Sequence, residues 1–547
     1  MTTFQLRSVR RVGRALLVAP LLLVGQSCTE LTETPHDALT PENAFKTDAE
    51  LLAGVAGVYA ALRPIDQEAG RFVGLEDLTT DVLIVPTRGQ DWDDGGQWLD
   101  MHRQTYTANS AGTLNFLNGS WNDKFSGIAK ANLMIDVVQK AGLPQARKDS
   151  VLAELRTVRA WFYYMLQDMF GGAPPLVTST ELKTYPSSTR QELFQFIEKE
   201  LTESAPHLPP TRAAENYGRV TKGVANAILA SLYLNAGVFS KNTGVSVTSY
   251  NSCAGIQVSG SKNACQAAID AADAVINSGV YSLAVPWAKN FGHDNNTSPE
   301  NIFVIVYTSE GSQGLGLNWP MRTLHYNQLN TGWGSPWNGF ATLAETYQQF
   351  EPTDERRGMW LAGQAFSFET RQPVNNRTGD PLIFTPEIPD ARQANEAHGV
   401  RFNKFPPLPS ATTGNAHPSD FPFFRLSEMY LIKAEAMNEL GQAGALAELA
   451  RVHNLRNPAS PVAAAPGQAM RDAILRERLL EFAGEGKRRT DLIRHGQFLT
   501  WRESSANGVC GANPAAGCPA RAAHRILFPV PVTQLASNPN LTQNPGY

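Results

Sequence analysis

Apolar residues recur every three to four positions through several long segments of this chain, and this spacing is what most restricts its fold. Near the start of the body, Leu51, Val55 and Val58 fall on one face of a helix. Thr47 and Glu50 match a capping box, in which each side chain bonds the other residue's backbone amide and marks where a helix begins. Because an amphipathic helix must bury its apolar face against another element, the spacing predicts a mainly α fold.

The same periodicity predicts a series of helices separated by turns rich in Gly and Pro. Paired helices of this length are typical of tetratricopeptide-like units, although no consensus of about 34 residues repeats cleanly. We expect a single body over residues 28–547, with a helical N-terminal part over about 31–286 and C-terminal helices with a terminal arm over 421–547. Beyond the helix after Thr47, the expected helices cover residues 121–140, 149–170, 190–204, 221–238, 264–278, 424–440, 443–454 and 468–482.

The pattern changes between residues 287 and 420, where Gly, Pro, Asn and Trp are frequent and apolar runs are short. Only residues 302–307 predict a strand, and residues 343–350 predict a short helix. Long irregular insertions inside compact proteins are usually functional, so we expect this segment to carry part of a binding site. Past the last helix, residues 526–532 predict a short strand or an extended arm, followed by a tail rich in Pro and Asn.

The first 27 residues have the order of a secretory signal peptide. Four arginines between positions 7 and 14 precede the apolar run 15–24, and small or polar residues then lead to Cys28. That position predicts lipid attachment at Cys28, which would anchor the mature chain to a membrane. Gly25 stands where a strict lipobox has Leu, so cleavage without lipidation is the alternative. No later segment approaches the roughly 20 apolar residues of a transmembrane helix.

The other four cysteines form two close pairs in the sequence. Cys253 lies near Cys265, and Cys510 lies near Cys518, each pair within a stretch rich in small and polar residues. In an exported chain, an even count at short spacing favours two local disulfides over a metal site.

The charge balance and the known catalytic motifs exclude several classes of function. The chain has 47 basic and 51 acidic residues, and removing the four arginines of the leader leaves 43 basic residues and a net charge of −8. A mildly acidic chain without a basic run argues against nucleic acid as a partner. Common hydrolase, phosphate-binding and zinc motifs are absent from the sequence, and we expect neither cofactor nor metal. A glycosidase remains an alternative, because its two carboxylates need only meet in space.

Two groups of tryptophans are the candidate ligand contacts. Trp92 and Trp98 flank a short run of Asp and Gly, and Trp319, Trp333 and Trp337 lie among asparagines in the irregular insertion. An indole face can stack on the apolar surface of a sugar ring while Asn, Asp and Arg bond its hydroxyls. The alternative is that the irregular loops bury these rings as a local core.

The helix over 468–482 and the turn after it carry a dense pattern of charges. A catalytic interpretation competes with ion pairs within and between helices, each stabilising by a few tenths of a kcal/mol. We favour the structural interpretation. The charged positions are Glu477, Arg478, Glu481, Glu485, Arg488, Asp491 and Arg494.

Several motifs together resemble the SusD/RagB family. Residues 423–436, FFRLSEMYLIKAEA, are similar to its hallmark helix, and the charged positions just named match its C-terminal motif in spacing. The segments Pro529-Val530-Pro531 and Asn544–Tyr547 look like its terminal signature. Trp121 with residues 127–132, and residues 159–163 leading to Gly171-Gly172, fit its second and third helices. The resemblance spans about residues 31–547.

The resemblance implies an outer-membrane lipoprotein built on tetratricopeptide-like helix pairs with a large loop-rich insertion. Such proteins face outward, cover a SusC-like TonB-dependent transporter and capture oligosaccharides or, in some members, peptides, without converting them. The family's ligand residues lie in loops after the first helices and in the insertion. In this chain those regions contain Arg88, Trp92, Trp98, Trp319, Trp333 and Trp337. A peptide-binding or purely structural lid subunit is the alternative.

Overall fold

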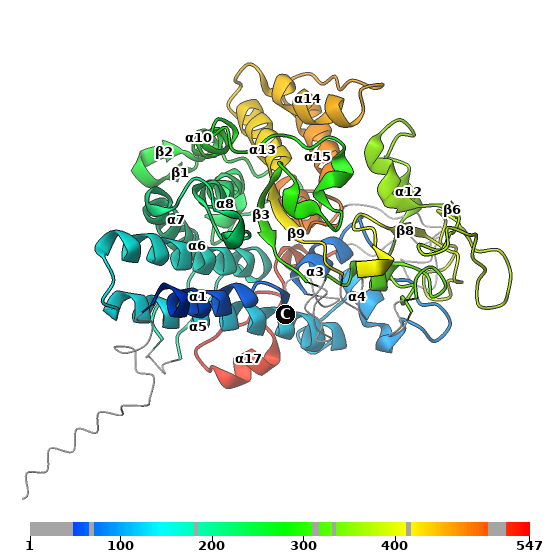
Figure 1. Ribbon diagram of the computed structural model, residues 1–547, viewed down its shortest axis with the longest axis horizontal. Helices are drawn as coiled ribbons and strands as arrows, with labels where there is room; N and C mark the ends of the chain where they lie inside the picture. Colours follow the sequence, from blue (N-terminus) through cyan, green and yellow to red (C-terminus); the bar gives the residue numbers. More distant parts are fainter. Residues whose placement is uncertain are drawn as a thin grey trace, which may run out of the picture.

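The structure is a computed structural model and describes residues 47–64, 71–179, 184–308, 317–330, 335–411, 417–500 and 521–547. It confirms the mainly α fold. Figure 1 shows the long helices gathered on one side and the loop-rich part on the other, with helices α13 to α15 above. None of the described helices is long and apolar enough to cross a membrane.

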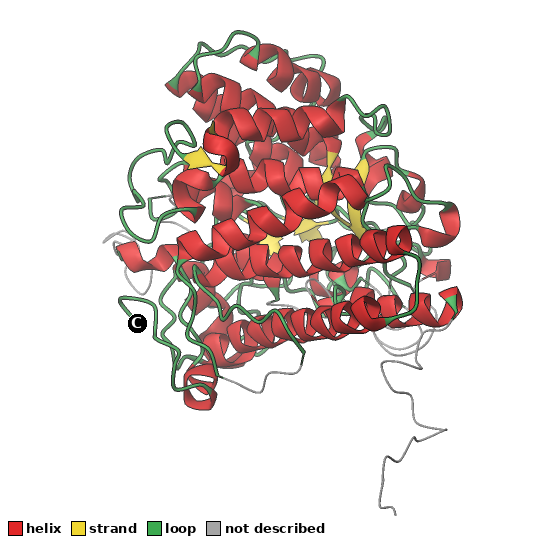
Figure 2. Cartoon of the chain, turned by 90° about the vertical axis from the view of Figure 1, so that its left-hand side faces the viewer, coloured by secondary structure: helices red, strands yellow, loops and turns green. Residues whose placement is uncertain are grey.

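The N-terminal helices pack against one another in succession, and Figure 2 shows long helices stacked above one another. Helix α5 packs on α6, α6 on α7, and α8 on α10, as expected for tetratricopeptide-like pairs. The capping box at Thr47 and Glu50 is formed, and a second one is formed by Thr189 and Glu192. The bounds are α1 Asp48–Ala60, α3 Phe72–Leu78, α4 Gln97–Arg103, α5 Asn118–Lys140, α6 Gln145–Phe170, α7 Arg190–Ser204, α8 Lys222–Leu234, α9 Ala236–Phe239 and α10 Ala264–Ile276.

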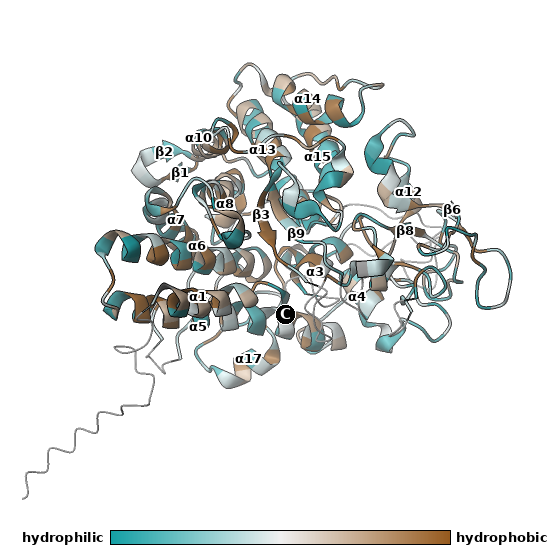
Figure 3. Cartoon of the chain, viewed as in Figure 1, coloured by the Kyte–Doolittle hydropathy of each residue, from teal (hydrophilic) through white to brown (hydrophobic). Residues whose placement is uncertain are grey.

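The C-terminal helices continue this packing, because α13 lies against both α10 and α14. Their bounds are α13 Leu426–Glu439, α14 Ala445–Arg456, α15 Gln468–Phe482, α16 Arg488–Arg494 and α17 Val532–Ser537. The helix predicted over 424–440 begins two residues later, because strand β9 (Phe421–Arg425) precedes it. β9 pairs antiparallel with β3 (Asn301–Ile305), which is the predicted strand at 302–307. Figure 3 shows β3 as a hydrophobic segment in the middle of the molecule.

The insertion contains several short strands besides β3, so the prediction of a single strand in this segment is wrong. Strands β4 (Ala341–Thr342), β8 (Val400–Phe402) and β5 (Trp360–Leu361) form a small sheet, and β6 (Gly363–Gln364) pairs with β7 (Ile383–Phe384). The helix predicted over 343–350 is shorter and covers α12 (Ala344–Tyr347). The insertion also contains α11 (Trp319–Thr323). The strand pair β1 (Gln257–Val258) and β2 (Lys262–Asn263) lies outside it, just before α10.

The extended-arm alternative holds for the chain after residue 526. Leu527 and Pro531 have extended backbone conformations, and the residues between them form neither helix nor strand. The Phe528 amide donates to the Met169 carbonyl oxygen at 2.8 Å, which fixes the arm to the end of α6. The disulfide predicted between Cys253 and Cys265 is formed. The predictions for Cys28 and for the pair Cys510 and Cys518 lie outside the described residues.

The charged residues of α15 and of the segment after it form the ion pairs that the structural interpretation predicts, but these ion pairs are buried rather than on the surface. Glu481 accepts from Arg425 at 2.6 Å and from Arg356 at 3.0 Å, and all three side chains are 0% exposed. Arg425 also bonds Glu300 at 2.6 Å, which ties α15 to the strand pair β3 and β9. Burial alone would raise the pKa of the Glu481 carboxyl, but the surrounding guanidinium groups hold it well below its usual range. The few tenths of a kcal/mol expected for each ion pair on a helix surface therefore do not apply to this buried network.

Candidate functional site

The backbone brings the first tryptophan group next to the insertion. Ile84 and Ala341 form a β-bridge with hydrogen bonds of 2.8 and 2.9 Å, so the segment before Trp92 runs beside the segment after Trp337. Arg88 and Asp91 then close a tight turn by exchanging two backbone hydrogen bonds. The turn places Trp92 over residue 337.

The structure brings Trp92 and Trp337, one from each predicted group, into contact, and both are half-buried. The Trp92 indole Nε1 donates to the Trp337 carbonyl oxygen at 2.7 Å. Its ring lies directly on Gly339, where any Cβ would stand 2.3 Å from a ring carbon. The Trp337 ring packs on a small apolar cluster of Met321, Leu324 and Leu329. Trp92 also packs against Trp98 and Phe340, and both Trp92 and Trp337 remain partly exposed.

Two other predicted tryptophans form the local core that was the alternative. Trp98 is 4% exposed, packs against Trp92 at 5.3 Å between ring centroids, and donates to Asp94 at 2.7 Å. Trp319 is 1% exposed and packs between Phe340 and Phe402. A ring this buried offers no face to a sugar, so the prediction that these two contact ligand is corrected: they support the loops. Trp333 lies outside the described residues.

Arg88 is likewise buried, at 2% exposed, and its guanidinium donates hydrogen bonds to backbone carbonyl oxygens. It donates to Asn338 at 2.8 Å, to His398 at 2.9 Å and to Asn395. Burial lowers the pKa of Arg88 to about 10, so it stays charged at neutral pH. The predicted ligand contact is thus replaced by a structural role, in which Arg88 joins the turn before Trp92 to both segments of the insertion.

Arg401 and Asn338 complete this junction, which we call the arginine clamp (Arg88, Asn338, Arg401). Arg401 is fully buried and donates to the Asn338 side chain at 2.9 Å and to the Glu396 carbonyl oxygen at 2.5 Å. Asn338 has a left-handed φ of 52°, which turns the chain sharply after Trp337. Neither arginine has a carboxylate ion-pair partner among the described residues, and backbone carbonyls bond both guanidinium groups instead.

Beside the two half-buried tryptophans lies a set of polar groups that the sequence pattern did not reveal. Tyr326 donates to Asp91 at 2.6 Å, and the Arg377 guanidinium lies 4.3 Å above the Tyr326 ring. Arg377 also bonds Asp91 at 3.0 Å and forms an ion pair with Glu396. Together these residues form a continuous surface, which we call the aromatic–ionic surface. Its members are Asp91, Trp92, Tyr326, Trp337, Arg377 and Glu396.

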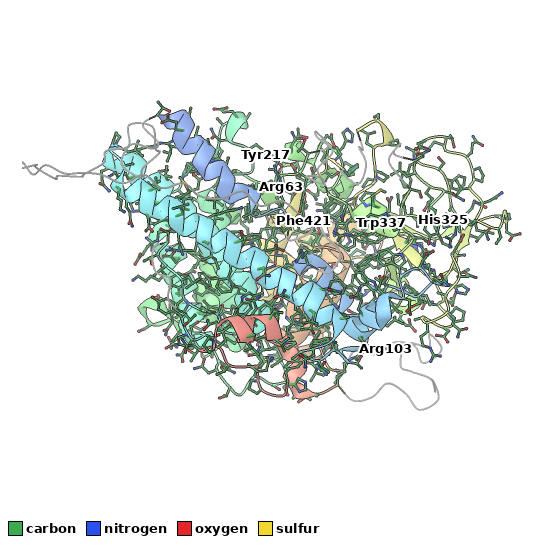
Figure 4. All side chains as sticks on the ribbon, turned by 90° about the horizontal axis from the view of Figure 1, so that it is seen from below. Arg63, Arg103, Tyr217, His325, Trp337 and Phe421 are labelled. Carbon is green, nitrogen blue, oxygen red and sulfur yellow. A yellow bond between two sulfur atoms is a disulfide. The ribbon has the colours of Figure 1, made fainter. Side chains whose placement is uncertain are left out.

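The surroundings of Glu396, His325 and Tyr326 shift the pKa of each of these groups. Burial alone would raise the pKa of Glu396, but hydrogen bonds from Arg377 and from His325, at 2.9 Å, hold it at about 2. Burial lowers the pKa of His325 despite this contact. Burial and the bond to Asp91 raise the pKa of the Tyr326 hydroxyl, which therefore remains a donor. Figure 4 shows Trp337 and His325 near each other at the loop-rich end, away from α1.

The surface combines residues from three separate stretches of the chain, around positions 91, 326–337 and 377–396. Only the tryptophans carry a signal in the sequence, because a Trp in a polar loop is unusual. Tyr326, Arg377 and Glu396 look like ordinary loop residues until the fold places them together.

Two family models match this chain. One, described as "SusD family", matches residues 294–547, and the other, described as "Starch-binding associating with outer membrane", matches residues 55–234. Among characterised relatives, SusD-like protein P2 of Formosa agariphila is 27% identical over 97% of this chain and 98% of its own length. The starch-binding protein SusD of Bacteroides thetaiotaomicron is 25% identical over 77% of this chain and 76% of its own.

Solved structures of SusD-like and surface glycan-binding proteins share the fold of this chain. A laminarin-binding SusD-like protein superposes with a TM-score of 0.70 at 21% identity, covering 92% of this chain and all of the other. Surface glycan-binding protein A of Bacteroides thetaiotaomicron, solved in complex with laminarihexaose, gives a TM-score of 0.67 at 20% identity over 91% of this chain and 99% of its own.

Proposed function

The chain belongs to the SusD/RagB family, and on that premise we propose that it is a non-enzymatic glycan-binding lipoprotein of the outer membrane. It would capture oligosaccharides and pass them to a SusC-like TonB-dependent transporter. The names of its relatives support the ligand class, since one is a starch-binding protein and one structural neighbour was solved with laminarihexaose.

The observation that carries the ligand class is the aromatic–ionic surface. Half-buried rings of Trp92, Tyr326 and Trp337 lie beside ionised Arg377 and Glu396. Ligand sites combine apolar area with a few placed polar groups that fix orientation, and aromatic side chains supply that area at low entropic cost. A sugar presents the complementary chemistry, with an apolar C–H face and a rim of hydroxyls.

The surface is also preorganised for such a ligand. The bond from Trp92 to the Trp337 carbonyl and the pairs of Arg377 hold these groups before any ligand arrives. Preorganisation reduces the ordering cost on binding, which otherwise offsets much of the gain from a small contact area. Affinity at one such site would still be modest, which suits a protein that releases its cargo.

Isothermal titration and tryptophan fluorescence with laminarihexaose and a malto-oligosaccharide would test the ligand class. We expect binding to the wild type and a loss of about tenfold in the variant Trp337→Ala, which removes a stacking face. Phe366→Ala is the matched control, because Phe366 is an exposed aromatic (49%) outside this surface. Equal affinity in all three proteins would reject the surface as the site. Release of reducing ends by the purified protein would reject the non-enzymatic assignment.

The transporter and the anchor need their own tests. Co-purification with a transporter, without any glycan-induced shift in melting temperature, would favour the peptide-binding or structural lid. A Cys28→Ala variant that remains in the membrane fraction in the absence of the transporter would reject lipid anchoring at that residue.

A further inference from the structure

A cavity of about 720 Å³ lies between the start of α7 and the C-terminal arm. The turn after α6 and the loop after α9 complete its wall. It shares no residue with the aromatic–ionic surface. Its volume lies within the range of small-molecule sites, roughly 300–1,000 Å³.

The cavity has the electrostatic character of an anion site. None of the described residues that line it is acidic, while Arg190, Lys241 and His524 all contribute to the wall. This contrasts with the chain as a whole, whose net charge is −4. Glu192, the nearest acid on α7, is turned back onto Thr189 in the capping box.

Arg190 is the central feature. Its side chain is 7% exposed, and its Nε and Nη2 atoms find no hydrogen-bond partner among the described residues. Its guanidinium lies 5.4 Å above the Phe239 ring. Asp168 attracts it from a distance, but the Asp168 carboxylate already accepts from Thr490 at 2.6 Å and contacts Arg489. A buried guanidinium with two nitrogen atoms that lack hydrogen-bond partners is costly, so a ligand that supplies an anion would be favoured there.

His524 gives a second unpartnered donor or acceptor. Its Nε2 atom is buried and has no hydrogen-bond partner among the described residues, while its ring packs against Tyr547 at 4.5 Å. Burial lowers the pKa of His524, so the ring is neutral at pH 7 and can bond a hydroxyl as well as a carboxylate.

The rest of the wall does not suit a bare inorganic ion. Phe170, Leu527 and Val530 give an apolar side, and hydroxyl and amide groups such as Ser187 and Asn242 give a polar one. An inorganic anion would leave the apolar side uncovered. A sugar ring with a carboxylate would cover it and offer hydroxyls to the polar side.

We propose that this cavity binds a carboxylate-bearing sugar of the hexuronate type, with the carboxylate on Arg190 and with Lys241 and His524 beside it. The site is independent of the glycan surface around Trp337. It would give the protein a preference for acidic glycan units or their free sugars, whichever ligand the other surface takes.

Isothermal titration of the full mature protein with glucuronate, glucose and sulfate tests the proposal. We expect glucuronate to bind, glucose to bind at least tenfold more weakly, and sulfate to bind more weakly than glucuronate. Arg190→Gln should lower glucuronate affinity at least tenfold, and Lys241→Gln severalfold. Lys199→Gln, an exposed lysine on the same helix α7, should leave the affinity unchanged.

Thr542→Trp keeps the test decisive if Arg190→Gln does not fold, because an indole at this exposed wall position would fill the cavity. It should abolish glucuronate binding. The proposal is overturned if glucuronate fails to bind, if glucose or sulfate binds as well, or if Lys241→Gln and Thr542→Trp bind like the wild type. Trp337→Ala should retain glucuronate binding, so failure of this site and failure of the glycan surface are distinguishable.

Discussion

At the scale of single residues, Gly339 decides whether Trp92 can take its place. The Trp92 ring occupies the space that a side chain at 339 would need. We expect Gly339→Ala to displace the ring, to lower oligosaccharide affinity and to lower the free energy of unfolding by about 1–3 kcal/mol, the usual cost of overpacking. Urea unfolding and tryptophan emission would measure both effects. Gly358→Ala is the control, since open space surrounds an added Cβ there, and equal behaviour of the two variants would contradict the argument.

A variant of Arg88 tests whether this residue has a structural role or contacts the ligand. Arg88→Met removes the donors of three backbone carbonyls, and we expect a loss of about 2–4 kcal/mol in the free energy of unfolding. Hydrogen exchange should rise in residues 395–398, which the arginine clamp holds. A variant of unchanged stability that no longer binds oligosaccharide would show instead that Arg88 contacts the ligand directly.

Asp77 makes the free energy of unfolding depend on pH, and its contribution falls as the pH rises. Burial raises its pKa from 3.8 to about 7, despite a hydrogen bond from the Gly486 amide. The folded state therefore holds a proton that the unfolded chain has lost between these pH values, and the contribution of Asp77 to stability falls as pH rises from about 4 to 7. Asp77→Asn should remove this slope, worth up to about 4 kcal/mol over the interval. Denaturant unfolding at pH 4.5 and 7.5 would measure it; parallel wild-type and variant curves would refute it.

At the scale of elements, the Cys253–Cys265 disulfide closes the loop that leads into α10, with a sequence separation of 12. Restricting a loop of this length in the unfolded chain stabilises by roughly 3 kcal/mol in the chain-entropy model. We expect the double variant Cys253→Ser/Cys265→Ser to lose about 2–4 kcal/mol, because the two hydroxyls would also be buried. Thermal unfolding of the oxidised wild type, the reduced wild type and the variant would measure this. A reduced wild type as stable as the oxidised protein would contradict it.

At the scale of the whole molecule, the buried ion network joins parts of the chain far apart in sequence. Glu481 on α15 contacts Arg356 from the insertion, Arg425 from β9 and Arg456 from α14. Removing one partner leaves uncompensated buried charge, so we expect Glu481→Gln to lower the free energy of unfolding by about 3–5 kcal/mol. Asp472→Asn, an exposed position on the same helix, is the control for chemical denaturation. A cost below 1 kcal/mol would mean that the network does not join these parts energetically.

The sequence by itself determined the long helices and the class of fold, whereas short helices such as α4 and α16 were not predicted. Helix positions follow from a local rule, the recurrence of apolar residues at 3.6-residue spacing, and caps such as Thr189 with Glu192 are also local. The pairing of Cys253 with Cys265 was likewise readable from short spacing. Two predicted helix bounds were wrong. The start of α13 is later than predicted because strand β9 precedes it, and α12 is shorter than predicted because the chain turns after Tyr347.

Only the tertiary structure decided which predicted site residues remain accessible. Trp92 and Trp337 keep part of their surface exposed, whereas Trp98, Trp319 and Arg88 are buried, although all five lie in similarly polar stretches of the sequence. Burial depends on long-range packing, and Arg377 and Glu396 reach Asp91 only through the fold. Long-range packing also explains why two nitrogen atoms of Arg190 lack hydrogen-bond partners among the described residues. Whether a guanidinium finds a carboxylate depends on the three-dimensional neighbours of its side chain, which spacing along the chain does not specify.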